Sequence, residues 1–251
     1  MQNLKAVTGN NRKFLLPGLS IFSIMFLSSV LIKAQALKPI HDGRDESETP
    51  AASNKYEAFI KQNALPKARQ HWKDNEACNE EFSIVGETNG SFTKANSSQT
   101  AILYRYCTRG HNFANNGIVI VENQKIVIHL VYEGAEDYSI AALPDINSNG
   151  LSELIIEDGS TNQGYTVGVV NIIELSSNKV KKFGITDTYE DNCGAVEKCT
   201  STAYRLLVKT GSVPVFYRET YKKSRNKWVL SGKAKSTKLR EDEIVYDFIL
   251  N

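Results

Sequence analysis

The residues with the clearest potential for chemistry form one short loop at positions 145–154, which reads Asp-Ile-Asn-Ser-Asn-Gly-Leu-Ser-Glu-Leu. Oxygen-bearing side chains occupy its first, third, fifth and ninth positions, namely Asp145, Asn147, Asn149 and Glu153. Gly150 stands at the sixth position, where a sharp bend is needed, and the carbonyl oxygen of Leu151 at the seventh offers a further ligand. Because alternate residues of a tight loop point inward, this spacing suits a hard cation such as Ca²⁺.

The loop is not an EF-hand, because the twelfth position of an EF-hand loop is an acid and Ile156 stands there. Apolar residues precede it at 140–143 and follow it at 154–156, so we expect it to connect two strands of a β-hairpin. Only two of its side chains are charged, and low ligand charge predicts a weak site, with a dissociation constant of about 10⁻⁴–10⁻³ M. The alternative is a turn without metal, since Asp and Asn accept backbone hydrogen bonds and tolerate left-handed conformations.

The string 143–154, Leu-Pro-Asp-Ile-Asn-Ser-Asn-Gly-Leu-Ser-Glu-Leu, resembles the calcium loop of FG-GAP or VCBS-type repeats. Such repeats form blades of integrin-α-like β-propellers in extracellular proteins, and the resemblance covers about residues 140–170. It implies that Asp145, Asn147, Asn149 and Glu153 bind a structural Ca²⁺. The chain holds one such loop, whereas a propeller needs several blades.

The composition is that of a globular protein, with 41% hydrophobic and 23% charged residues in a chain of 251. Disordered, collagen-like and coiled-coil proteins are thereby excluded. Four of the 30 basic residues lie in the first 36 positions, which hold no acid, so the rest of the chain carries a net charge of about −2. Such a near-neutral body gives no general reason to expect nucleic-acid binding.

Residues 1–36 have the pattern of an export signal. A basic start at 5–13 precedes the uncharged apolar run 14–32, and Ala34-Gln35-Ala36 supplies the small residues that signal peptidase reads. The alternative is an uncleaved N-terminal membrane anchor, because an apolar run of this length could just span a bilayer. Pro17 and the small-residue site favour cleavage, which predicts a secreted protein, extracellular or periplasmic, with no membrane span in its mature part.

All four cysteines, Cys78, Cys107, Cys193 and Cys199, follow this segment, as expected for disulfides in an oxidising compartment. Four cysteines allow three pairings. The short separation of Cys193 and Cys199 favours that pair, which leaves Cys78 with Cys107. Zinc binding by these cysteines is disfavoured by their spacing.

The remainder predicts one mostly β domain at 55–251, after a flexible linker at 37–54 that is polar and lacks periodicity. A short helical stretch at 55–74 is broken or kinked at Pro66. Strands with two-residue periodicity follow at 82–86, 100–107, 117–122, 125–132, 139–143, 153–157, 167–175, 179–183, 201–209, 215–221, 227–233 and 243–250. Asn123-Gln124 forms a two-residue hairpin turn, and 125–132, apolar on both faces, is expected at the centre of a sheet. The fold class is therefore antiparallel sheets in a sandwich or a partial propeller.

The remaining polar groups give weaker signals. His129 is expected as a partly buried strand residue, and His111 lies in a polar turn. Glu157 and Asp158 predict a solvated turn, and 158–165 a connecting loop with potential for recognition. These observations favour an exported, non-catalytic binding or surface-interaction protein with a protein or glycan partner and one structural Ca²⁺. The alternatives are a secreted hydrolase, whose catalytic groups would meet only in the fold, and an exported protein inhibitor.

Overall fold

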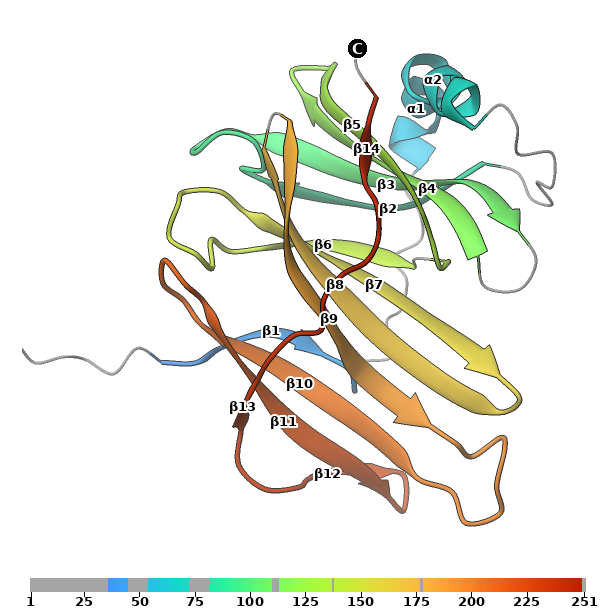
Figure 1. Ribbon diagram of the computed structural model, residues 1–251, viewed down its shortest axis with the longest axis vertical. Helices are drawn as coiled ribbons and strands as arrows, with labels where there is room; N and C mark the ends of the chain where they lie inside the picture. The colour runs from blue at the N-terminus through green and yellow to red at the C-terminus, as the bar shows by residue number, and fades with distance from the viewer. Residues whose placement is uncertain are drawn as a thin grey trace, which may run out of the picture. The chain divides into compact units, whose positions relative to one another are not determined.

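Antiparallel strands make up most of the structure, a computed structural model, and this confirms the fold class that the periodicity predicts (Figure 1). It describes residues 36–44, 54–72, 82–109, 113–136, 138–176 and 178–249. The export-signal prediction for 1–36 falls almost entirely outside these ranges. Within the described ranges, neither helix has the length and apolar character that a membrane crossing requires.

The strands form two sheets. In chain order the strands are β1 (Lys38–Asp42), β2 (Ser83–Gly90), β3 (Gln99–Arg109), β4 (Phe113–Glu122), β5 (Lys125–Gly134), β6 (Ser139–Leu143), β7 (Glu153–Asn162), β8 (Tyr165–Ser176), β9 (Lys179–Asp191), β10 (Ser201–Lys209), β11 (Val215–Ser224), β12 (Lys227–Leu230), β13 (Lys235–Thr237) and β14 (Asp247–Phe248). One sheet has the order β12-β11-β10-β9-β8-β7-β6, with β1 added beside β10 and β13 beside β11. The other has the order β14-β5-β4-β3-β2.

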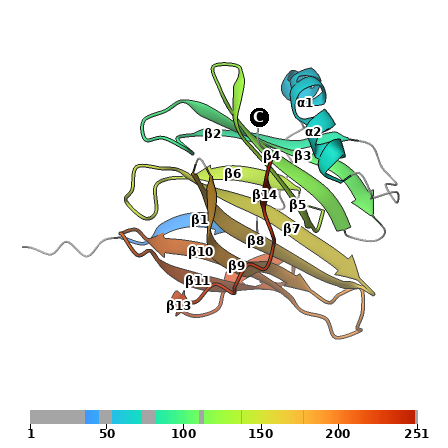
Figure 2. The ribbon, with the colours of Figure 1, turned by 45° about the horizontal axis from the view of Figure 1, so that its top comes forward.

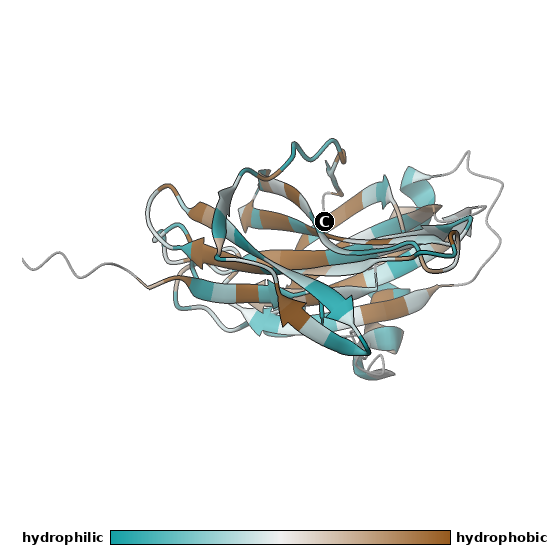
Figure 3. Ribbon diagram, turned by 90° about the horizontal axis from the view of Figure 1, so that it is seen from below, coloured by the Kyte–Doolittle hydropathy of each residue, from teal (hydrophilic) through white to brown (hydrophobic). Residues whose placement is uncertain are grey.

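The two sheets pack face to face through a shared apolar core, with β6–β8 lying under the five-stranded sheet (Figure 2). The alternation of side chains along β4 shows how the sequence forms this core. Ile118 and Ile120 enter it, whereas Val119 and Val121 point to the opposite face of the sheet. Apolar and polar segments accordingly alternate along the strands in Figure 3. The two-residue period of a strand therefore supplies each sheet with two distinct faces.

Two short helices cover the outer face of the five-stranded sheet. A turn of 3₁₀ helix at Asn54–Tyr56 leads into α1 (Glu57–Asn63), and α2 (Leu65–His71) follows after Ala64. Pro66 lies in the first turn of α2, where its missing N–H group breaks no helical hydrogen bond. Ile60, Ala64 and Ala68 pack against the outward-facing side chains of the sheet. The predicted helical stretch is thus confirmed through His71, but its interruption lies at Ala64 and Pro66 belongs to α2.

The nine-stranded sheet curls around a third apolar core on its other face, and β10–β13 lie below β6–β9 in Figure 1. This core joins Ile155, Val170 and Ile172 to Leu206 and Val208. Because β9 pairs with β10 only at residues 189–191, the rest of that edge of β10 is open to another strand.

Strand β1 fills this open edge, which corrects the first part of the flexible linker predicted at 37–54, whereas residues 45–53 lie outside the described ranges. Lys38 to Asp42 pair antiparallel with residues 205–208 of β10, and Ile40 packs against the third core. The sequence lacks a clear two-residue period there because the pairing contains a bulge after Pro39. Pro39 is compatible with an edge strand, where one side of the backbone needs no partner.

Strand β5 is not central as predicted. Its outer neighbour is the two-residue strand β14, whereas β4 has long partners on both sides. β4 is accordingly buried from Ala114 to Val121. The turn between the two strands is the predicted hairpin, and Asn123 and Gln124 both have positive φ, as a type I′ turn requires.

The C-terminal segment crosses from one sheet to the other. After β13 it forms a bridge between Arg240 and Ile185 of β9, and it ends with β14 against Leu130 and Val131 of β5. This path is visible as the dark red strand and coil that climb from β13 to β14 in Figure 1. Lys182 donates hydrogen bonds to the carbonyl oxygens of Asp242 and Ile244, which holds the crossing segment on β9.

One predicted disulfide is confirmed, since Cys193 and Cys199 are bonded across a short turn with a Cα–Cα distance of 4.6 Å. Cys107 is disulfide-bonded as well. Its predicted partner, Cys78, lies outside the described residues.

A buried Tyr–His pair lies between the five-stranded sheet and the helices. The Oη atom of Tyr104 and the Nε2 atom of His129 are 2.6 Å apart, and both side chains are buried. Burial raises the pKa of Tyr104 and lowers that of His129 to about 4, so both groups are neutral at pH 7. Gly117 of β4 pairs with Tyr104 of the neighbouring strand β3, and a Cβ atom at Gly117 would lie 2.1 Å from the tyrosine ring.

Replacing Gly117 by alanine should therefore displace Tyr104 and lower the free energy of unfolding by about 1–3 kcal/mol or more, the usual cost of overpacking a core. Gly134→Ala is the matched control in the next strand, because its Cβ atom would meet Tyr132 at an ordinary 3.6 Å. Urea denaturation of both variants measures the difference. Equal unfolding midpoints would contradict this account of Gly117.

Candidate functional site

The loop predicted to bind a cation connects β6 to β7 and is closed by its own side chains. The Oδ1 atom of Asp145 accepts a hydrogen bond from the backbone N–H of Asn149 at 3.1 Å, and its Oδ2 atom accepts one from Gly150 at 2.7 Å. Gly150 has a φ of +86°, and Ser148, two residues before it, has a φ of +63°. The bend therefore uses left-handed backbone at both residues. The N–H group of Leu151 donates to Oδ1 of Asn149 at 2.9 Å. The predicted β-hairpin position of the loop is thereby confirmed.

A carboxylate that the sequence analysis missed lies beside this loop. Glu174 of β8 accepts hydrogen bonds at Oε2 from the side-chain amides of Asn147, at 2.5 Å, and Asn149, at 2.7 Å. Its other oxygen, Oε1, is 4.0 Å from the ammonium group of Lys181. Glu174 could have been noticed as an acid between apolar residues of a predicted strand. Burying such a carboxylate costs free energy unless it has hydrogen-bond or ionic partners.

Two buried oxygens of the loop have no hydrogen-bond partner among the residues that the structure describes. Glu153 is 0% exposed. Its Oε2 atom accepts a hydrogen bond from the backbone N–H of Ile146 at 3.0 Å, whereas its Oε1 atom accepts none from the described residues. The Oδ1 atom of Asn147, a residue 5% exposed, is also unpartnered. Burial, together with the negative charges of Glu174 and Asp145, raises the pKa of Glu153 to about 7. Buried acceptors without a donor are rare in folded proteins, and a bound cation would satisfy both oxygens.

The structure thus brings Asp145, Asn147, Asn149 and Glu153 into one loop and adds Glu174. Over the described residues, no group of three or more His, Cys, Asp or Glu side chains has an arrangement suited to a metal ion. The loop differs from such groups because it combines carboxylates with neutral amide oxygens. Both kinds of oxygen are ligands that Ca²⁺ accepts.

The segment 158–165 is not the connecting loop that the sequence predicts. β7 continues to Asn162, β8 begins at Tyr165, and a two-residue turn at Gln163 and Gly164 joins them. Both turn residues have positive φ, which fits the right-handed twist of a hairpin. Small polar residues therefore extend the strands here instead of ending them.

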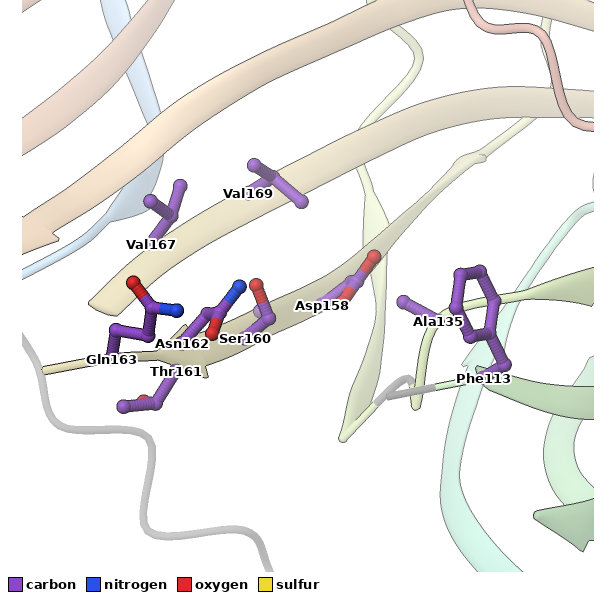
Figure 4. A pocket seen from close by; sticks show the side chains of 10 residues that line it. Phe113, Ala135, Asp158, Ser160, Thr161, Asn162, Gln163, Val167 and Val169 are labelled. Carbon is purple, nitrogen blue, oxygen red and sulfur yellow. The ribbon is translucent and has the colours of Figure 1, made fainter. Parts of the chain in front are cut away.

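One face of this hairpin lines a cavity of about 790 Å³. Asp158, Ser160 and Asn162 point into it from β7, with Val167 and Val169 beside them on β8 (Figure 4). Phe113, at the start of β4, and Ala135, just after β5, lie beyond the Asp158 end of this row (Figure 4). Phe113 is 65% exposed.

Asp158 is the one ionisable side chain among the ten described residues that line this cavity. Burial raises its pKa to about 6, although a hydrogen bond from the backbone of Gly159 partly offsets this. Its neighbour Glu157 points to the opposite face of the strand, where it accepts a hydrogen bond from Ser139 at 3.0 Å. The Glu157–Asp158 pair thus lies in a strand, not in the solvated turn expected from the sequence, and its two carboxyl groups face different cavities.

The histidines take separate places. His129 is the buried partner of Tyr104, more deeply buried than expected, and His111 lies outside the described residues. His41 Nε2 is 3.7 Å from a carboxylate oxygen of Glu157. His71 Nε2 is 3.3 Å from a carboxylate oxygen of Asp247.

Comparison of the chain with protein-family models, with curated proteins and with solved structures found no match.

The raised pKa of Asp158 predicts a pH dependence of stability. Because ionisation of this carboxyl is disfavoured in the folded state, the free energy of unfolding should fall as the pH rises from about 4 to about 6 and stay level above that. At about 1.4 kcal/mol per pKa unit, the loss is at most about 3 kcal/mol. In Asp158→Asn this component should be absent, so chemical denaturation of both proteins across this range measures it. Parallel pH profiles would contradict the prediction.

Proposed function

We propose that this chain is an exported, non-catalytic binding protein that recognises a glycan through the cavity on the Asp158 face of the β7–β8 hairpin. The observation that supports this most directly is the row of Asp158, Ser160 and Asn162, with the exposed side chain of Phe113 at the Asp158 end of the same cavity. Export is supported by the signal-like segment at 1–36 and by the disulfide between Cys193 and Cys199.

The chemistry of the cavity suits a ligand rich in hydroxyl groups. A carboxylate, a hydroxyl and an amide on alternate residues of β7 offer both acceptors and donors, which sugar hydroxyls require at each carbon. Sugar rings also have apolar C–H faces, and an exposed aromatic ring such as that of Phe113 can pack against one. The cavity volume lies within the range of about 300–1,000 Å³ that is typical of small-ligand sites.

The alternative of a secreted hydrolase has a specific requirement. Glycoside hydrolysis needs two carboxyl groups on either side of the scissile bond, about 5–10 Å apart. Among the described residues that line this cavity, Asp158 supplies one such group, and the carboxyl of its neighbour Glu157 points to the opposite face. This geometry favours binding over hydrolysis at this site.

We further propose that the 145–153 loop holds a structural Ca²⁺. Its ligands would be side-chain oxygens of Asp145, Asn147, Asn149 and Glu153 and the carbonyl oxygen of Leu151, with Glu174 as an additional carboxylate. Support comes from the unpartnered buried oxygens of Asn147 and Glu153 and from the concentration of negative charge there. The ion would fix the β6–β7 hairpin and has no part in a reaction.

The glycan proposal predicts saturable binding of an oligosaccharide to the purified protein. Saturation-transfer NMR with a panel of soluble plant, animal and bacterial oligosaccharides would identify a ligand, and titration calorimetry would give its dissociation constant. Asp158→Asn and Ser160→Ala should each weaken binding about 10-fold, because each removes a polar contact in a partly enclosed site.

Glu243→Gln is the matched control, since Glu243 is exposed and is not among the residues lining the cavity. Release of shorter sugars from the bound oligosaccharide would instead support the hydrolase alternative. Failure of every oligosaccharide in the panel to bind would count against the glycan assignment and leave a protein partner.

The calcium proposal predicts a higher melting temperature in Ca²⁺ than in chelator. At a calcium concentration about ten times the dissociation constant, binding stabilises the folded state by about 1.4 kcal/mol, which corresponds to roughly 3–6 °C for a domain of this size. Glu153→Gln should abolish this difference and leave the protein folded, because the replacement is neutral and nearly the same shape. Differential scanning calorimetry of both proteins, with Glu243→Gln as control, measures the effect. Identical melting of the wild type in millimolar Ca²⁺ and in chelator would refute the site.

A further inference from the structure

The other face of the β7–β8 hairpin lines a second, smaller cavity of about 250 Å³. It lies under the curled part of the nine-stranded sheet, since residues from β7, β8, β9, β11 and β12 and from the end of β1 contribute to its walls. Its volume is below the range usual for drug-sized ligands, so it fits a small molecule with one ring. Its lining differs in kind from that of the Asp158 cavity.

A pair of glycines lets aromatic and hydroxyl side chains pack closely on the hairpin beside this cavity. Gly159 and Gly168 face each other across β7 and β8, in the middle of the hairpin. A Cβ atom at Gly159 would lie 1.8 Å from the hydroxyl of Tyr138, and one at Gly168 would lie 3.2 Å from Thr188 and Tyr189. The missing side chains therefore allow Tyr138 to lie directly on the hairpin.

Three aromatic residues form the apolar part of the lining. Tyr189 and Trp228 meet edge to face, with their ring centres 6.2 Å apart and their planes at 81°. Tyr138 completes the set from the segment before β6. Aromatic surfaces at right angles to one another suit a flat ring, which can stack on one and meet the edge of the other.

Charged groups of both signs line the same cavity. Arg44 is fixed by Asp42, to which its Nε donates at 2.8 Å, and its guanidinium lies 3.9 Å from the ring centre of Tyr221. The ammonium group of Lys223 is 5.6 Å from the ring centre of Trp228. Glu157 contributes the negative charge, held by its hydrogen bond from Ser139. A ligand with a cationic and an anionic group would match this lining.

We propose that this cavity binds a free aromatic α-amino acid. The ring packs against Trp228 and Tyr189, the carboxylate pairs with Lys223, and the ammonium group pairs with Glu157. This site is independent of the glycan proposal, because its ring and charge contacts come from different side chains, although Val167 lines both cavities.

The chain itself contains the reporter for a direct test. Trp72 and Trp228 are its two tryptophans, and Trp72 lies at the end of α2, stacked on Tyr106. In Trp72→Phe, the fluorescence of Trp228 reports the cavity alone. Titration with L-phenylalanine, which does not absorb at 295 nm, should change this emission saturably. Calorimetric titration of the unsubstituted chain gives the same dissociation constant independently and serves if Trp72→Phe does not fold.

Ligand analogues separate the three contacts. 3-Phenylpropionate lacks the ammonium group, phenethylamine lacks the carboxylate and L-leucine lacks the ring, so each should bind at least 10-fold more weakly than L-phenylalanine. Equal binding of any of the three would overturn the assignment to an aromatic amino acid. The absence of any saturable signal or heat with L-phenylalanine would overturn the site.

Protein variants test the same contacts from the other side. Glu157→Gln and Lys223→Gln should each weaken binding of L-phenylalanine at least 10-fold. Lys222→Gln is the matched control, because Lys222 is an exposed neighbour in β11 that does not line the cavity, and it should bind with unchanged affinity. Unchanged binding in both lining variants would contradict the proposed placement of the two charged groups.

Discussion

The structure depends on the face-to-face packing of two antiparallel sheets across one apolar core. Residues such as Ile118 and Ile120 of β4 meet Leu154 and Ile156 of β7 there. Because successive side chains of a strand point in opposite directions, the same strands must also find cover for their second faces. The helices supply that cover for one sheet, and the curl of the other sheet supplies it for itself.

Where β7 and β8 extend beyond this core, the alternation of their side chains separates polar residues instead of apolar ones. Near Ile156 the two faces of β7 are both apolar, and from Glu157 onward both are polar. The same alternation that builds the cores then places Asp158 and Glu157 in separate cavities. A single hairpin thus presents two chemically distinct linings without any insertion in the chain.

Most strands could be predicted from the sequence, because their two-residue period and the turns between them are local signals. Ser139–Leu143 and Ser201–Lys209 coincide with the observed β6 and β10. β1 could not be predicted, since it is extended only because β10 offers an open edge more than 160 residues away in sequence. The extension of β7 and β8 through 158–165 was missed for another reason, because small polar residues are typical of loops and only their pairing with each other makes them strands.

The candidate site was likewise predictable only in part. Asp145, Asn147, Asn149 and Glu153 are close in sequence, so their spacing predicted one shared loop. Glu174 comes from a neighbouring strand, and its contact with Asn147 and Asn149 depends on the register of β7 with β8. The cavity linings combine segments as distant as Phe113 and Val169, and sequence adjacency carries no information about such juxtapositions.

The path of the C-terminal segment has a consequence for how the chain acquires its structure. β5 gains its outer neighbour only when Asp247 and Phe248 arrive, more than 110 residues after Val131. Until then β5 is a long unpaired edge, which is a hazard for association with other chains. Removal of β14 should therefore expose this edge of β5 at Leu130 and Val131 to pairing with another chain.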